Sequence, residues 1–172
     1  MIWGKPKLGI HFVENGNFLD CLIQNVPRKG FLKHIGVETE IIQDFSVNIV
    51  IEDKNIEDEI ERVVYYGSRA MQFGEDYLTY KKQIILPASD RLCARVNIVT
   101  ATPEGAHIID ANFDPNKLSR VYVDTELKVG TYQFTIKTFA NGKITETIKN
   151  FEYRSSEPYL VWKNNDSSRG KR

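Results

Sequence analysis

The fold class is decided by the stretch GTYQFTIKTFANGKITETIK, which spans residues 130–149. Tyr132, Phe134 and Ile136 alternate with threonine, glutamine and lysine side chains, which is the two-residue period of a strand with one buried face. Asn141 and Gly142 follow, and this pair favours a tight hairpin turn. The stretch therefore predicts two long antiparallel strands.

The length of this hairpin loop determines which side chains are buried. A two-residue loop pairs Phe134 with Lys149 and leaves Ile144 and Ile148 on the polar face. A three-residue loop over residues 140–142, with its glycine left-handed, brings both isoleucines to the buried side. Because burying an isoleucine is worth about 1.5–3 kcal/mol, we expect the three-residue loop.

The same alternation recurs along the chain. Residues 8–12 and 19–23 form an opening hairpin, and residues 45–51 form a central strand. Short strands at near-regular spacing are typical of an all-β, immunoglobulin-like two-sheet β-sandwich, here with about seven to nine strands. We expect the core to be drawn from Leu8, Ile10, Phe12, Leu19, Cys21, Ile23, Phe45, Val47, Ile49, Leu92, Val96, Ile98, Tyr132, Phe134 and Ile136.

Three segments depart from this pattern. Phe31, Leu32 and Ile35 recur at helical spacing before a glycine, which predicts one helical turn that caps an end of the sandwich. Residues 53–61 are either a short helix or a charged hairpin tip that leads into an edge strand, and both interpretations stay open. Residues 68–80 are expected to be irregular.

Composition and charge limit the partners. Among the 172 residues, 23 Lys and Arg balance 23 Asp and Glu, so no net field favours nucleic acid. We expect one domain over residues 1–163 and a polar tail over residues 164–172. No stretch approaches the roughly 20 apolar residues of a membrane span. Trp3, Lys5 and Lys7 suggest a membrane only through a segment absent from this chain, so the chain would be the soluble part of a tethered protein.

Cys21 and Cys93 are the two cysteines. Cys21 shares its parity with buried positions, whereas Cys93 alternates with Arg91 and Arg95 and should face outward. A disulfide needs converging side chains, so we expect two free thiols.

Two stretches carry a resemblance to a known family. Residues 19–25, LDCLIQN, and residues 129–136, VGTYQFTI, resemble the second and penultimate strands of bacterial and archaeal immunoglobulin-like, adhesion-related modules. Val26 and Pro27 stand where that family usually has a glycine-containing turn, and residues 53–83 are longer than its modules carry. The resemblance implies a sandwich that serves as a spacer or binding unit of a cell-envelope protein.

Few motifs carry chemistry. Asp110, Asn112 and Asp114 place oxygen side chains at alternate positions, which suits Ca²⁺, but an EF-hand would have Gly where Pro115 stands and Glu where Val121 stands. A plain turn explains the same residues, and no cofactor is expected otherwise. No Gly-x-Ser-x-Gly, His-Glu-x-x-His, Walker or Cys-x-x-Cys motif is present, so we expect no catalytic residues and no enzymatic activity.

An aromatic cluster is the candidate contact surface. Tyrosine and arginine are enriched at protein interfaces, although such rings could also form the small core of this segment. The residues expected to form the surface are Tyr65, Tyr66, Arg69, Phe73, Tyr77 and Tyr80. The leading hypothesis is a noncatalytic interaction or structural module that binds a protein partner or itself. The alternatives are a carbohydrate- or calcium-binding sandwich and an enzyme with an unrecognised site.

Overall fold

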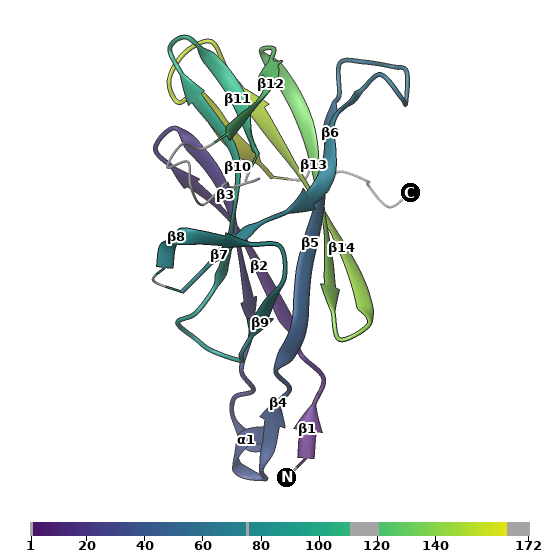
Figure 1. Ribbon diagram of the computed structural model, residues 1–172, viewed down its shortest axis with the longest axis vertical. Helices are drawn as coiled ribbons and strands as arrows, with labels where there is room; N and C mark the ends of the chain where they lie inside the picture. Colours follow the sequence, from purple (N-terminus) through teal and green to yellow (C-terminus); the bar gives the residue numbers. More distant parts are fainter. Residues whose placement is uncertain (1, 75, 111–120, 165–172) are drawn as a thin grey trace, which may run out of the picture.

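The chain folds into two antiparallel sheets packed face to face, as the computed structural model shows (Figure 1). The structure describes residues 2–74, 76–110 and 121–164. The prediction of an all-β two-sheet sandwich is confirmed. The described residues form fifteen strands, more than the seven to nine expected, because several strands are only three residues long.

The first sheet has five strands in a continuous order and two beside them. The order is β12 (Val121–Leu127), β11 (Gly105–Asp110), β10 (Ala94–Thr102), β3 (Phe18–Asn25) and β2 (Leu8–Asn15). The short strand β7 (Met71–Phe73) pairs with β10 and with β8 (Asp76–Lys81). Residues 68–80, expected to be irregular, are thus largely extended and paired.

The second sheet contains the hairpin predicted from residues 130–149. Its order is β15 (Leu160–Lys163), β14 (Lys143–Tyr153), β13 (Gly130–Ala140), β5 (Ile42–Asp53) and β6 (Val63–Arg69), and β9 (Ile84–Leu86) also pairs with β5. The connection between β5 and β6 is a hairpin tip, so the helical alternative for residues 53–61 is wrong.

The core lies between the sheets and follows the alternation read from the sequence. None of the fifteen residues expected in the core is exposed. Eleven are buried, and Leu8, Ile10, Phe12 and Leu92 are partly buried. The three partly buried side chains of β2 pack against the core from the edge of the first sheet.

One helical turn interrupts the strands. The helix α1 spans Phe31–His34, and Gly36 follows it with a φ of 78°, the left-handed conformation predicted for this position. The helix buries none of its residues, so it does not cap the core as expected. It lies instead beyond one end of the sandwich, beside the parallel pair of β1 (Ile2–Gly4) and β4 (Val37–Thr39) (Figure 1).

Both cysteines are free, as predicted. Cys21 is fully buried, and burial together with the neighbouring Asp20 carboxylate raises the pKa of its thiol well above the usual range. Cys93 is partly exposed. The two thiols should therefore differ strongly in reactivity, since the thiolate is the reactive form.

A thiol titration tests this difference. We expect a thiol reagent to modify one cysteine of the native protein at neutral pH and the second only after denaturation. The substitution Cys93→Ser should remove the fast reaction and leave the slow one. Two equally fast reactions would contradict the burial of Cys21.

Candidate interaction surface

The hairpin between β13 and β14 turns on two residues. Its loop is Asn141–Gly142, with φ values of 48° and 76°, which are typical of a type I′ turn. Phe134 consequently pairs with Lys149. The three-residue loop predicted from the burial of isoleucines is wrong, because Ile144 and Ile148 lie on the outer face of the second sheet.

Contacts distant in sequence hold this turn in place. The backbone N–H of Asn141 donates to Asp44 Oδ1 at 3.2 Å, and the side-chain oxygen of Asn141 accepts from the backbone N–H of Gln43 at 3.3 Å. The side-chain amide of Asn141 donates to the carbonyl of Ile41 at 3.2 Å. The loop is therefore fixed to the start of β5, which favours the two-residue turn beyond its local preference.

An apolar row crosses the outer face of the second sheet. Ile148 pairs with Thr135, Thr135 with Val50, and Val50 with Tyr66. Residues directly opposite one another on antiparallel strands point to the same face, so these four side chains lie side by side on β14, β13, β5 and β6. Tyr66 is 69% exposed and Ile148 is 43% exposed.

A second, shorter apolar row lies nearer the hairpin turn. Phe139 pairs with Ile144, which is 62% exposed. Exposed isoleucines in a strand are normal when they occur singly, but here two rows share one face. We call this surface the outer apolar face, and it consists of Val50, Tyr66, Phe139, Ile144 and Ile148.

A polar row separates the two apolar rows. Lys137 Nζ lies 3.7 Å from Glu146 Oε2, and Ser68 Oγ donates to Asn48 Oδ1 at 2.8 Å. Lys137 pairs in register with both Glu146 and Asn48. These side chains already have partners within the chain, so a covering surface need not supply a countercharge for either member of the ion pair.

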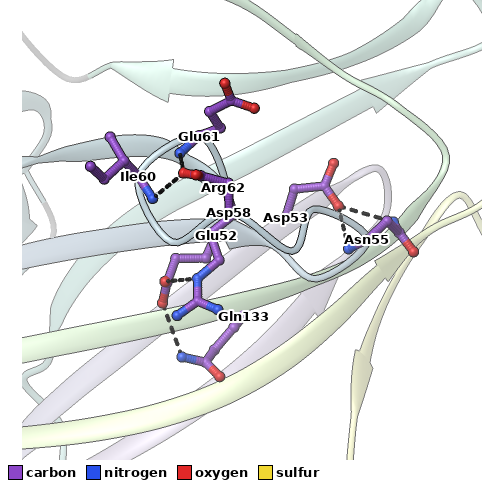
Figure 2. A network of polar contacts seen from close by, with 8 residues as sticks. All are labelled: Glu52, Asp53, Asn55, Asp58, Ile60, Glu61, Arg62 and Gln133. Carbon is purple, nitrogen blue, oxygen red and sulfur yellow. Dashed lines mark hydrogen bonds and ion pairs between the residues drawn. The ribbon is translucent and has the colours of Figure 1, made fainter.

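A polar network borders the outer apolar face at the end where β5 leads into β6. Figure 2 shows Glu52 between Arg62 and Gln133. Arg62 Nε donates to Glu52 Oε1 at 2.9 Å, and the Gln133 amide donates to Glu52 Oε2 at 3.1 Å. Both carboxylate oxygens of Glu52 are thus engaged, and the network joins β5, β13 and the hairpin tip.

Two further carboxylates shape the hairpin tip itself. Asp53 Oδ1 accepts from the backbone N–H and the side-chain amide of Asn55, both at 2.9 Å. Asp58 Oδ1 accepts from the backbone N–H groups of Glu61 and Ile60 at 3.0 and 2.8 Å (Figure 2). The hydrogen bond from the backbone of Glu61, and to a smaller extent that from Ile60, lowers the pKa of the Asp58 carboxyl. Such bonds are those of turns, which indicates a structural role for these acids.

A shallow hollow of about 580 Å³ adjoins the outer apolar face. Its lining is polar except for one isoleucine, and it consists of Lys54, Thr131, Gln133, Ile148, Asn150, Lys163 and Asn164. Within the described part of the chain, no group of three or more His, Cys, Asp or Glu side chains is placed to hold a metal ion. The hollow therefore adds hydrogen-bonding groups to the rim of an apolar surface.

The structure does not bring the predicted contact residues onto one surface. Tyr66 lies on the outer apolar face, whereas Tyr65 faces the interior and Phe73 packs against the core from the first sheet. Arg69 is fully buried, with its guanidinium carbon 4.6 Å from the centre of the Tyr65 ring. The prediction of a surface role is wrong for Arg69.

Other predicted site residues lie outside what the structure describes. The side chains of Tyr77, Tyr80 and Asp110 are outside the described residues, and so are Asn112 and Asp114. The calcium hypothesis for that segment stays a prediction. The residues that sequence reasoning missed are Val50, Phe139, Ile144 and Ile148, and the preference of the Asn-Gly pair for a two-residue turn is the signal that points to the two isoleucines.

Comparisons with known proteins do not add to this geometry. No protein-family model matches the chain, and no curated protein or solved structure matches it at the significance required. No helix among the described residues is long and apolar enough to cross a membrane.

Proposed function

We propose that this chain is a noncatalytic interaction module that binds a protein partner, or a second copy of itself, through the outer apolar face. The observation that carries the proposal is the exposure of Ile144 and Ile148 on the same sheet face as Tyr66. The likeness to immunoglobulin-like adhesion-related modules agrees with such a role. That a further segment tethers the module to a membrane stays a prediction.

The energetic reason is the apolar area that a partner would cover. Burial of apolar surface is worth about 25 cal/mol per Å², and full burial of an isoleucine about 1.5–3 kcal/mol. Ile144 and Ile148 gain only part of this energy on folding, because 62% and 43% of their surfaces stay exposed. A partner that covers them gains the remaining part on binding.

Tyr66 gives the surface its second property. A tyrosine presents a large ring that loses little conformational entropy and a hydroxyl that can hydrogen-bond at an interface. Arg62 and Gln133 lie at the polar end of the face, where they contact Glu52. The surface thus combines two apolar rows with an internally paired polar row between them and hydrogen-bonding groups at one end, and protein interfaces contain apolar and polar area in such a mixture.

Site-specific photo-cross-linking tests the proposal. A photoreactive phenylalanine derivative at position 148 should form a discrete adduct of defined mass, with a second copy in the purified protein or with a partner in an extract of the source cells. The same group at Glu59, an exposed residue of the hairpin tip, is the matched control and should form none.

Competition distinguishes a specific contact from a chance one. Excess unlabelled protein should suppress the adduct, whereas the double variant Ile144→Thr/Ile148→Thr should not. Threonine keeps the β-branched shape, so the melting temperature should stay nearly unchanged, as for most surface substitutions. Equal suppression by both proteins would show that the outer apolar face is not the contact surface.

A further inference from the structure

The helix α1 lies at one end of the molecule (Figure 1), and the apolar side chains of this helical turn are exposed. Phe31 is 74% exposed, Ile35 is 52% exposed, and Leu32 between them is also exposed. A four-residue helix in which no residue is fully buried gains little packing energy from its apolar side chains. We call these three residues the apolar tip.

Backbone and side-chain hydrogen bonds hold the apolar tip on a short stem, which is formed by β1, β4 and Arg28. The strands β1 and β4 pair in parallel, and the backbone N–H of Glu40 donates to the carbonyl of Gly4 at 3.1 Å. Arg28 precedes the helix, and its backbone N–H donates to Thr39 Oγ1 at 2.8 Å. Its guanidinium donates to the carbonyl of Lys5 at 3.1 Å. The chain segments before and after the tip are thus hydrogen-bonded to each other and to the N-terminal segment.

A buried asparagine joins this stem to the sandwich. The side-chain amide of Asn25 donates to the carbonyl of Glu40 at 2.8 Å and to that of Leu86 at 3.2 Å. The backbone carbonyl of Asn25 accepts from the N–H of Ser89 at 3.1 Å. Asn25 is fully buried. The apolar tip is therefore presented at a set position relative to the body of the protein.

The tip and its stem carry an excess of positive charge, although the whole chain is neutral. Residues 4–7 and 28–41 hold five lysine and arginine side chains and two glutamates. Lys29 forms an ion pair with Asp90 at 3.2 Å, and the other lysines of the segment are exposed. These exposed lysines are Lys5, Lys7 and Lys33.

We propose that the apolar tip inserts into the headgroup region of an anionic lipid bilayer. A protruding cluster of Phe, Leu and Ile can bury its area among acyl chains without a shaped groove, and nearby lysines are attracted to anionic headgroups. The positive excess around the tip is the observation that favours a lipid surface over an apolar protein groove. Three apolar side chains give weak, reversible binding rather than permanent insertion.

Vesicle flotation tests the inference with the full chain. We expect it to float with vesicles of phosphatidylcholine and phosphatidylserine in a ratio of about 7:3, and much less with phosphatidylcholine alone. Added salt should release it, because salt screens the contribution of the lysines. The double variant Phe31→Gln/Ile35→Gln should lower the partition coefficient roughly tenfold or more, since it removes two inserting side chains.

The variant Ile60→Gln/Val63→Gln is the matched control, because it removes two exposed apolar residues of the hairpin between β5 and β6, outside both the apolar tip and the outer apolar face. It should float like the unaltered protein. Unchanged flotation of the Phe31→Gln/Ile35→Gln protein, or no preference for phosphatidylserine, would overturn the inference. The apolar tip lies outside the outer apolar face, so either result leaves the cross-linking test of the proposed function unaffected.

Discussion

Replacing Arg69 with alanine is expected to lower the free energy of unfolding by about 3–5 kcal/mol. Arg69 is fully buried and pairs in register with Val47, so its side chain crosses from the second sheet into the interior. Its guanidinium donates to the carbonyls of Asn97 and Ile98, both at 3.4 Å. The substitution would remove these donors and leave a cavity beside the Tyr65 ring.

The position of those carbonyls explains why an arginine lies here. The pairing of β10 with β3 shifts register between Asn97 and Val99, so the ladder is irregular at Ile98. An irregular ladder leaves carbonyls without their usual partners, and buried carbonyls need donors. Arg69 supplies them from the opposite sheet. It therefore links the two sheets at a point where one of them is interrupted.

Denaturant unfolding of matched variants checks this expectation. Arg62→Ala removes a partly exposed arginine with an ion pair to Glu52, and it should cost less than about 1 kcal/mol. The loss in the free energy of unfolding for Arg69→Met should fall between these two values, because methionine fills the space of the aliphatic part of the arginine side chain but donates no hydrogen bonds. A loss for Arg69→Ala as small as that for Arg62→Ala would refute the role assigned to the buried guanidinium.

The core could be predicted because its signal is local. Alternation of period two needs no knowledge of partners, and Phe45, Val47 and Ile49 all face the interior as it indicates. The helical turn before Gly36 was also readable, since a left-handed glycine ends it. Alternation does not indicate where a turn lies relative to other strands. The helical turn was therefore expected to cap the core, whereas it lies beyond one end of the sandwich and buries none of its residues.

The hairpin register shows where the burial argument fails. Burial alone favours the three-residue loop, but Ile144 and Ile148 are exposed in the unfolded chain as well as in the folded one. Leaving them in water therefore forgoes a gain and does not oppose folding. The three hydrogen bonds of Asn141 to the start of β5 act only in the folded protein, and they favour the two-residue turn.

The candidate surface was predicted only in part, because it depends on strand pairing that residue types alone do not reveal. Tyr66 was identified from its residue type, whereas Val50 and Phe139 join it through pairing that spans β5 and β13. Arg69 was placed on the surface because arginine is enriched at protein interfaces. Its burial depends on an irregularity in β10, which no residue pattern in β6 reveals.

Replacing Trp162 with alanine is expected to lower the free energy of unfolding by about 3–5 kcal/mol. Its indole ring contacts three phenylalanines at the side of the sandwich, with ring centres 4.8 to 5.9 Å apart. These are Phe12, Phe134 and Phe151. Phe12 belongs to the first sheet and the other two to the second, so the indole contacts both layers.

The same residue closes the gap between β15 and β2. The indole N–H donates to the carbonyl of Val13 at 3.2 Å, and the backbone N–H of Trp162 donates to Glu14 Oε1 at 2.9 Å. Both acceptors lie on β2, the edge strand of the opposite sheet. Trp162 thus joins the last described strand of the chain to the first long one by hydrogen bonds as well as by packing.

The substitution Trp162→Phe separates these two contributions. It keeps an aromatic ring and loses the indole N–H, so it should cost about 1–2 kcal/mol, much less than alanine. Unfolding should be followed by circular dichroism, because both variants remove a tryptophan fluorophore. If phenylalanine were as costly as alanine, the hydrogen bond to Val13 rather than the aromatic cluster would be the main link between the sheets at this edge. If neither variant changed the midpoint, β15 would not contribute to closing the sandwich.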